Sequence, residues 1–238
     1  MADLSMSVAK GIIHGLIGPN GAGKTTVFNL ISGLVPASGG EIVFKGQRVS
    51  GRRPAHVCRA GVARTFQATA LFMEYTVLEN VLVASDRSAG VVLGASMLGW
   101  RGSGARERAA LDRAHTLLAS VELDGVAQQV AAQLPHRDQK ALSLAMALAT
   151  GPELLLLDEP MAGLTAQETE QMIGRLRHLR REGMTVMLVE HDMKAVMDLC
   201  DVITVLDHGV RIAEGTPRAI QEDAGVIEAY LGAEGHGA

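Results

Sequence analysis

The chain has 238 residues, of which 47% are hydrophobic, and its formal net charge is −4 with acidic and basic residues interspersed. This length suits one large domain or a core with a subdomain, and the mixed charge gives no electrostatic reason to expect nucleic acid as a partner. The longest nearly apolar stretch, Ala89 to Trp100, is well short of the roughly 20 residues that span a membrane, and no secretory signal is visible. Cys58 and Cys200 lack the spacing of a metal site or a disulfide framework, which fits two unpaired thiols in a reducing, cytoplasmic compartment.

The first third of the chain predicts strands, a glycine-rich turn and a helix. Residues 4–8 (LSMSV) are interpreted as a strand, and residues 12–18 (IIHGLIG) form a short apolar run of the kind that a buried strand has. Helical spacing starts at Lys24 and stops at Gly33, which is a natural C-cap. Residues 39–49 (GGEIVFKGQRV) then predict a strand or one arm of a hairpin.

Helices alone are predicted from residue 68 to residue 149. Thr76 and Glu79 form a T-x-x-E capping box, and the helical segment VLENVLVA follows. The Gly- and Ser-rich residues 88–104 predict a loop before a long helix over residues 105–123. We therefore expect a helical subdomain, residues 68–149, inserted between residues 1–67 and 150–238 of a core.

Strands return in the last third, over residues 153–158 (ELLLLD), 184–190 (MTVMLVE) and 201–207 (DVITVLD). A second capping box, Thr165 with Glu168, opens the helix between the first two. Strands without alternation, separated by helices, imply a mainly parallel sheet covered on both faces. The predicted fold class is therefore α/β.

The glycine-rich turn fits the phosphate-loop pattern G-x-x-x-x-G-K-[ST], and it stands between a predicted strand and a predicted helix. Backbone N–H groups of such a loop form an anion nest, which the positive end of the following helix reinforces. Lys24 would hold the β- and γ-phosphates and the Thr25 hydroxyl would bind Mg²⁺; the alternative is a glycine turn that merely precedes a lysine. No N-K-x-D motif specifies guanine, so ATP is favoured. The predicted nucleotide-binding residues are Gly18, Pro19, Asn20, Gly21, Ala22, Gly23, Lys24, Thr25 and Thr26.

Further candidates for chemistry stand at or after strand ends. Asp158 can organise Mg²⁺ through a bound water, and Glu159 can polarise the attacking water as general base. A solvated acidic turn is the ordinary alternative for two such acids. His191 follows the next strand, where a histidine is more often structural but can also reach the γ-phosphate or the water. Gln67 can contact Mg²⁺ or the water, although spacing alone does not select it.

In this order the phosphate loop, Gln67, Asp158 with Glu159, and His191 resemble the ATP-binding subunit of ABC transporters. The segments RTFQATALFMEYTVLENVLVA, LLLLDEPMAGLTAQET and VIEAYLG are similar to the subunits that power bacterial branched-chain amino-acid importers, whose relatives also serve urea, amides and other solutes. The resemblance covers about residues 4–232. It implies a P-loop NTPase (RecA-like) core with a small antiparallel β region at its N-terminal side and an inserted α-helical subdomain.

The same resemblance implies an ATPase whose cofactors are ATP and Mg²⁺. Catalysis would depend on Glu159, His191 and Gln67, and the metal would be held by Thr25, Gln67 and Asp158. ATP would bind between two such subunits, in a homo- or heterodimer, at the cytoplasmic face of the inner membrane. Transmembrane permease subunits and, indirectly, a periplasmic binding protein would be partners, with the permease contact near residues 68–75.

The N-terminus departs from the family's pattern. Residues 1–17 hold no aromatic side chain to stack on adenine, and a strand that usually comes first in the family is missing. The chain is therefore expected to be shortened at its front, to bind ATP more weakly and to leave a sheet edge exposed. A misplaced start site is one explanation.

Residues 134–139 (LPHRDQ) stand where the family has its L-S-G-G-Q signature turn, which would touch the partner's ATP. The turn residues are Pro135, His136, Arg137 and Asp138, with Arg137 at the position of a glycine. This segment can be simply a turn into a helix with Asp138 as N-cap, or Arg137 can offer a cation to the γ-phosphate. Alternatively, the long side chain blocks closure, at a cost of roughly 100- to 1,000-fold in rate.

Two alternatives to a competent transport ATPase stay open. One is a hydrolysis-impaired nucleotide-binding partner subunit of such a transporter. The other is a soluble ABC ATPase of DNA repair or translation, which generally needs a long coiled coil or two tandem ATPase units, and neither fits this sequence.

Overall fold

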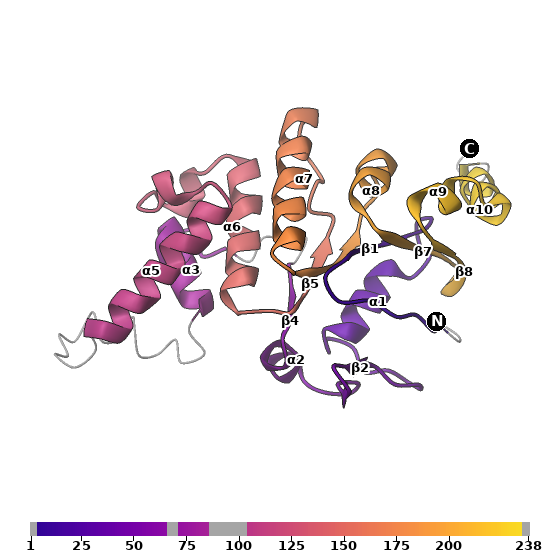
Figure 1. Cartoon of the computed structure of the whole chain (residues 1–238), viewed down its shortest axis with the longest axis horizontal. Coiled ribbons are helices and arrows are strands. Elements are labelled where there is room, and N and C mark those ends of the chain that lie inside the picture. The colour runs from indigo at the N-terminus through magenta and orange to yellow at the C-terminus, as the bar shows by residue number, and fades with distance from the viewer. Residues whose placement is uncertain (1–3, 66–70, 86–103, 235–238) are drawn as a thin grey trace. The chain divides into compact units, whose positions relative to one another are not determined.

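The computed structural model describes residues 4–65, 71–85 and 104–234. The chain forms two compact units, one of residues 1–64 with 153–238 and the other of residues 65–152 (Figure 1).

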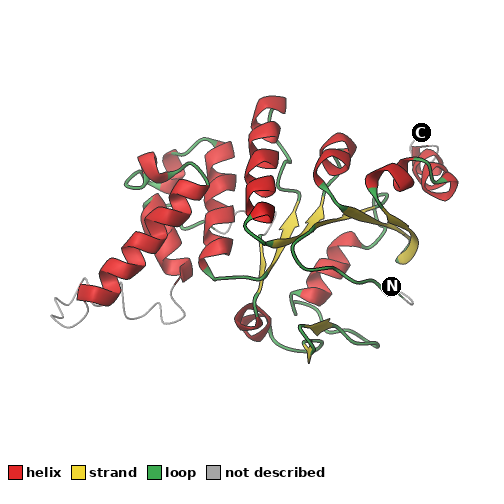
Figure 2. Cartoon of the chain, viewed as in Figure 1, coloured by secondary structure: helices red, strands yellow, loops and turns green. Residues whose placement is uncertain are grey.

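The first unit is built on a six-stranded sheet with the strand order β4-β5-β6-β1-β7-β8. Strands are drawn in yellow in Figure 2. Neighbouring strands of the sheet run parallel except that β8 is antiparallel to β7. Every residue of β1, β5 and β6 is buried, as expected for central strands covered on both faces. The strands are β1 (Ile13–Ile17), β4 (Val62–Arg64), β5 (Leu154–Asp158), β6 (Thr185–Val189), β7 (Val202–Asp207) and β8 (Val210–Gly215).

Helices cover both faces of this sheet. α1 (Lys24–Ile31) lies on one face, and α7 (Ala166–Arg181) and α8 (Met193–Leu199) lie on the other (Figure 1). Phe28 of α1 is fully buried in an apolar cluster with Leu156 and Met187 of the sheet. The remaining helices of this unit are α2 (Pro54–Ala60), α9 (Pro217–Gln221) and α10 (Ala224–Glu234).

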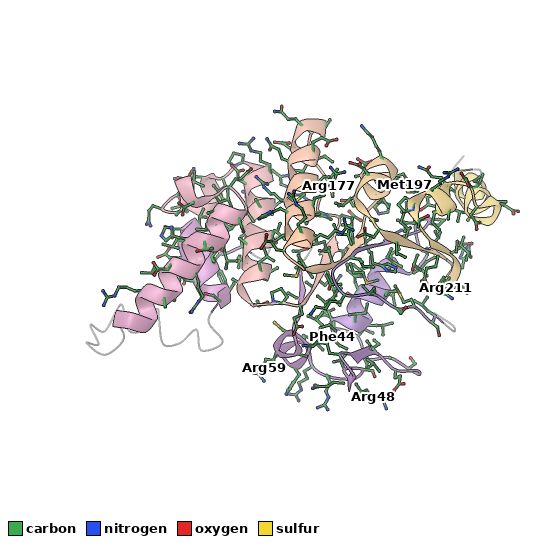
Figure 3. The ribbon with its side chains drawn as sticks, in the orientation of Figure 1. Phe44, Arg48, Arg59, Arg177, Met197 and Arg211 are labelled. Carbon is green, nitrogen blue, oxygen red and sulfur yellow. The ribbon has the colours of Figure 1, made fainter. Side chains whose placement is uncertain are left out.

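A small antiparallel hairpin stands apart from the main sheet. It consists of β2 (Val43–Phe44) and β3 (Gln47–Arg48), with Val43 opposite Arg48. Phe44 (labelled in Figure 3) packs against the same apolar cluster as α1. The predicted small antiparallel β region is therefore confirmed.

The second unit is helical in its described part. It contains α3 (Val77–Ser85), α5 (Gly104–Ser120) and α6 (His136–Ala149), with 3-10 turns at Asp124–Val126 and Ala131–Gln133. The predicted capping box is present, because the Thr76 N–H donates to Glu79 Oε2 (2.7 Å) and the Glu79 N–H donates to Thr76 Oγ1 (3.2 Å). None of the helices in the described ranges is long and apolar enough to cross a membrane.

Several predictions about individual elements are confirmed. The three strands expected in the last third of the chain form β5, β6 and β7, and Thr165 with Glu168 makes the second capping box, at the start of α7. α1 ends where predicted, with Gly33 just beyond it at a φ of 74°. The long helix α5 ends at Ser120 rather than at residue 123, because the chain turns at Glu122, which has a φ of 62°. The loop predicted over residues 88–104 lies almost wholly outside the described residues.

The strand predicted over residues 4–8 is wrong. Leu4, Met6 and Val8 do point one apolar face at the core and are partly buried there, which explains the alternating sequence. However, the backbone of this segment pairs with no strand in the described part of the chain. A strand requires a hydrogen-bonded neighbour, so the alternation alone does not produce one.

Candidate functional site

The candidate residues of the first unit gather at one edge of its sheet. β1, β5 and β6 are parallel neighbours in register, with Val189 paired both to Leu16 and to Asp158. Their carboxyl ends therefore lie side by side, and the phosphate loop, Asp158 and His191 begin or follow there. Ligands of open α/β sheets bind at such carboxyl ends.

The phosphate loop joins β1 to α1 through three glycines in backbone conformations that other residues rarely adopt. The φ angles are 149° at Gly18, 81° at Gly21 and 102° at Gly23. A Cβ at Gly18 would lie 2.0 Å from the carbonyl oxygen of Leu206, so only glycine fits there. Gly23 is the N-cap of α1, and no side chain of the described residues caps that helix start. The backbone N–H groups at the start of α1 are therefore available to bind an anion.

Lys24 is folded back over the loop. Its Nζ donates hydrogen bonds to the carbonyl oxygens of Gly18 (2.6 Å) and Pro19 (3.0 Å), and the side chain is buried. Burial lowers the pKa of Lys24, while the nearby carboxylates of Glu159 and Asp158 oppose that shift. The loop therefore holds a cation beside two anions, with the exposed Thr25 and Thr26 following it on α1.

Asp158 ends β5 and is almost completely buried. Its Oδ2 accepts a hydrogen bond from Arg64 at 2.7 Å, whereas its Oδ1 is buried with no hydrogen-bond partner among the described residues. An unsatisfied buried carboxylate oxygen calls for an explanation such as a bound ion or water. Together with the Thr25 hydroxyl it offers the oxygen ligands that Mg²⁺ prefers.

Mg²⁺ characteristically uses one or two protein oxygens, with phosphates and waters completing its shell. Within the described ranges, no group of three or more His, Cys, Asp or Glu side chains is arranged to hold a metal ion. A site with one carboxylate and one hydroxyl is consistent with that pattern, so the residues present fit Mg²⁺.

Glu159 and His191 contact each other across the sheet edge. His191 Nε2 lies 3.0 Å from Glu159 Oε1, with both side chains partly exposed. Glu159 has a φ of 50°, which is uncommon for a residue with a Cβ, and its N–H donates to the carbonyl of Val189 (2.9 Å). An unfavourable backbone conformation maintained in this way directs the carboxylate towards the histidine.

Glu190 was not identified from the sequence, yet it connects the two catalytic candidates. It is 4% exposed, and its two carboxylate oxygens accept hydrogen bonds from the N–H groups of Met161 (2.7 Å) and His191 (2.9 Å). Met161 lies two residues after Glu159, so one side chain joins both strand ends. The only signal in the sequence was an acid at the end of an apolar strand, which is not specific.

Two further contacts were also missed. Burial raises the pKa of Tyr230 on α10, and the neighbouring backbone of Gly18 partly opposes this shift. Arg64, at the end of the three-residue β4, binds Asp158. Both contacts join segments far apart in the sequence, and no local pattern predicts them.

Gln67 lies outside the described residues. The signature-turn candidates Pro135, His136, Arg137 and Asp138 belong to the second unit, where they begin α6. The prediction that Asp138 is the N-cap is wrong: Pro135 is the N-cap, because its carbonyl already accepts from the N–H groups of Asp138 and Gln139 (3.0 Å each). Asp138 instead lies in the first turn, where its negative charge interacts favourably with the helix dipole. It also forms an ion pair with Arg137 at 3.2 Å.

A glycine-lined loop with a buried lysine at the start of a helix, beside a strand-end acid pair and a histidine, defines a P-loop nucleoside triphosphatase. Residues 1–162 match the sequence model of the family described as ABC transporter, and residues 210–236 match that of the branched-chain amino acid ATP-binding cassette transporter. The chain belongs to the ABC transporter family.

Individual relatives agree with this assignment. The chain is 42% identical over 221 residues to the high-affinity branched-chain amino acid transport ATP-binding protein LivG of Escherichia coli (strain K12), covering 92% of this chain and 87% of LivG. It is 40% identical over 230 residues to BraF of Pseudomonas aeruginosa, which has the same description, covering 96% of this chain and 90% of BraF.

Solved structures agree on the fold. The ADP conformation of an ATP-binding cassette of an ABC transporter matches with a TM-score of 0.83 and 29% identity, over 96% of this chain and 91% of that one. A dimeric ATP-binding cassette in a post-hydrolysis state with ADP and Pi matches with a TM-score of 0.73 and 25% identity, over 90% and 88%. The predicted P-loop NTPase fold is confirmed, and the chain is an ATP-binding ATPase.

Proposed function

We propose that this chain is the ATP-hydrolysing subunit of an importer for branched-chain amino acids or a related small solute. The observation that carries the proposal is the meeting of the phosphate loop, Asp158 and the Glu159–His191 pair at one sheet edge. The names of LivG and BraF, and the match of residues 210–236, support this choice of solute. Solute itself would be recognised by other subunits.

In this proposal the phosphate loop, residues 18–26, binds the triphosphate. Its backbone N–H groups and Lys24 neutralise the phosphates, because an anion nest and a helix start act together there. The carbonyl oxygens that Lys24 now contacts belong to the same loop, so its ammonium can move to the phosphates with little displacement.

Glu159 is proposed to act as general base. It accepts a proton from the water whose oxygen attacks the γ-phosphorus, and the bond from that phosphorus to the β,γ-bridging oxygen breaks to leave ADP. A carboxylate oxygen can only accept, so His191 donates from Nε2 to Glu159 Oε1 and orients the base. Gln67 is proposed to contact the metal or the water.

Asp158 and Thr25 are proposed to hold Mg²⁺, with the unsatisfied Oδ1 of Asp158 as the oxygen that accepts from a metal-bound water. Mg²⁺ bound by these residues would supply positive charge that neutralises the charge developing on the phosphate oxygens. Asp158 and Thr25 contribute by fixing where the positive charge of the metal ion lies.

We further propose that the chain works peripherally at the cytoplasmic face of the inner membrane, paired with a second ATP-binding subunit as a homo- or heterodimer. Residues 68–149 would form the helical subdomain, and transmembrane permease subunits would dock near residues 68–75. A periplasmic binding protein would be an indirect partner. The dimeric neighbour structure supports the pairing.

Replacement of the general base tests the proposal. Glu159→Gln keeps the size of the side chain but cannot take up the proton, so ATP hydrolysis should fall by roughly 100-fold or more while nucleotide still binds. In cells whose own copy carries Glu159→Gln, uptake of radiolabelled leucine, isoleucine and valine should be lost. In vitro, steady-state phosphate release measures ATP hydrolysis, and a fluorescent ATP analogue measures nucleotide binding.

Glu182→Gln is the matched control, because Glu182 is exposed at the C-terminal end of α7 on the same unit. It should behave as wild type. Normal uptake of all three amino acids in the Glu159→Gln strain, with uptake of another solute lost, would overturn the proposed substrate class.

A second candidate function is that of a hydrolysis-impaired partner subunit. The exposed Arg137 on the first turn of α6 favours it, since a long side chain stands where the family has glycine. Because each shared site would combine one chain's phosphate loop with the other's signature turn, this change would affect only the site that the partner's phosphate loop forms. Single-turnover hydrolysis with and without the partner subunit separates the two functions.

A further inference from the structure

Arg64 holds the carboxylate that is proposed to organise the metal. It is the last residue of β4, which pairs in parallel with β5, and its NH2 group donates to Asp158 Oδ2 at 2.7 Å. The two side chains are only 7% and 2% exposed, so the ion pair is shielded from water. Such a pair is weak evidence for stability, which leaves open why a guanidinium is used here.

The other half of the guanidinium binds α1. NH1 donates to Asn29 Oδ1 at 2.6 Å and lies 3.3 Å from Ser32 Oγ, whose own proton is donated to the carbonyl of Phe28. The guanidinium carbon also lies 5.5 Å from the ring centre of Phe28. All three residues belong to α1 or its C-cap, and α1 is the helix that starts with Lys24 and Thr25.

One rigid group therefore connects the strand that carries Asp158 to the helix that carries the phosphate-binding lysine. The guanidinium is planar and presents its donors in a fixed fork, so the position of Asn29 determines where Oδ2 of Asp158 is held. A lysine carries its three N–H donors on one nitrogen, so it cannot reproduce this fork geometry between the two acceptors.

The two carboxylate oxygens of Asp158 therefore differ in their hydrogen bonding. Oδ2 is occupied by Arg64, and Oδ1 is the one with no partner in the described part of the chain. We infer that Arg64 is a positioning residue of the nucleotide site, which fixes Asp158 to α1 so that Oδ1 serves Mg²⁺. This inference rests on the proposed role of Asp158.

A different result would be expected if the Arg64–Asp158 ion pair only stabilised the fold. Loss of fold support would weaken nucleotide binding equally with and without Mg²⁺. Loss of positioning would weaken only the part of binding that Mg²⁺ adds, because the phosphate loop and Lys24 stay in place. Mutation of a residue that orients a metal ligand typically lowers metal affinity by about 10- to 100-fold.

The test measures binding of a fluorescent ATP analogue to the purified full chain, across a series of Mg²⁺ concentrations and in EDTA. For Arg64→Met we expect at least about tenfold weaker binding at saturating Mg²⁺ and less than about threefold change in EDTA. Arg64→Lys should lie between Arg64→Met and wild type. Unfolding curves without nucleotide report whether each variant is folded.

Two further variants keep the test decisive. Asn29→Ala removes only the hydrogen-bond acceptor of Arg64 on α1, and alanine suits a helix interior. This variant therefore replaces Arg64→Met if Arg64→Met does not fold. We expect Asn29→Ala to raise the Mg²⁺ concentration at which nucleotide binding is half-saturated. Arg177→Met is the control: Arg177 on α7 (labelled in Figure 3) pairs with Asp198 at 2.7 Å on the surface, and its loss should leave binding unchanged.

Asp158→Asn separates this inference from the proposed function. If Asp158→Asn loses the Mg²⁺-dependent part of binding while Arg64→Met and Asn29→Ala retain it, the role of Arg64 is overturned and that of Asp158 stands. If Asp158→Asn itself retains that part, both are overturned. Equal losses for Arg64→Met with and without Mg²⁺ also overturn the role of Arg64.

Discussion

His14 is a buried titratable side chain that takes no part in the nucleotide site. The Thr204 hydroxyl donates to Glu214 Oε2 (2.9 Å), so in the 2.8 Å contact between Thr204 and His14 it is Nε2 of the histidine that donates. Nδ1 then bears the lone pair and has no hydrogen-bond partner within the described ranges. Burial lowers the pKa of His14, and Glu214 only partly opposes this. A charged His14 is therefore unfavourable in the fold.

The free energy of unfolding should consequently fall as pH falls. In the unfolded chain His14 takes up its proton near its ordinary pKa of 6.5, whereas in the folded chain it does so only at lower pH. Above that ordinary value His14 contributes no pH dependence; below it stability is lost, until pH has passed through the folded pKa. Urea unfolding between about pH 7.5 and 5.5 measures the slope.

His14→Gln keeps a donor for Thr204 but does not titrate, so its stability should depend less on pH than that of wild type. His56→Gln, at an exposed position of α2, should keep the wild-type slope. If wild type and His14→Gln lose stability in parallel, the assignment to His14 is wrong.

At the scale of elements, the start of α6 is the feature with the clearest functional consequence. Arg137 is the second residue of this helix, and its exposed side chain forms an ion pair with its neighbour Asp138. Substitution there changes little of the fold, apart from the roughly 1 kcal/mol that glycine costs inside a helix. The position is therefore suited to a functional test.

Arg137→Gly should raise ATP hydrolysis by the assembled transporter, because it restores a backbone donor that a long side chain obstructs. One such donor to a developing charge is worth about 100- to 1,000-fold in rate, which sets the upper bound. Arg137→Lys, which keeps a long cation, should stay at the wild-type rate. A fall in rate for Arg137→Gly with activity retained in Arg137→Lys would instead assign Arg137 a direct contact with phosphate.

Elements with local signals were predictable, and elements defined by tertiary pairing were not. Both capping boxes lie within four residues, so Thr76 and Thr165 marked their helix starts correctly. β4 has three residues and is a strand only because it pairs with β5, and β8 is antiparallel only because a tight turn at Gly209 folds it onto β7. Neither property is visible in the residues themselves.

The same distinction holds for the site. The phosphate loop, Asp158, Glu159 and His191 have motifs or strand ends that identify them, whereas Arg64 and Glu190 act through partners 94 and 29 residues away. Spacing in the sequence gives no measure of such contacts. They become visible only once the register of β4, β5 and β6 is known.

At the scale of the whole molecule, the exposed aromatic pair of the second unit bears on assembly. Phe72 and Tyr75 stack with ring centres 5.5 Å apart, and they stay 45% and 39% exposed. Exposed aromatic side chains are typical anchors of protein interfaces. Their place in the sequence coincides with the predicted permease contact.

Phe72→Ser should therefore reduce the amount of chain that is recovered with affinity-tagged permease subunits, by roughly tenfold or more if the ring is an interface anchor. Ile212→Ser on β8, where the apolar side chain is 39% exposed, is the control and should be recovered as wild type. Equal recovery of both variants would exclude this aromatic pair as a docking point.

The double hydrogen bond of Glu190 restricts which side chains fit at this position. Both of its carboxylate oxygens already accept from backbone N–H groups, at Met161 and at His191. Aspartate is one methylene too short to reach both, and glutamine would set an NH2 group against an N–H. Either replacement would therefore leave a backbone N–H group without its acceptor, at Met161 or at His191.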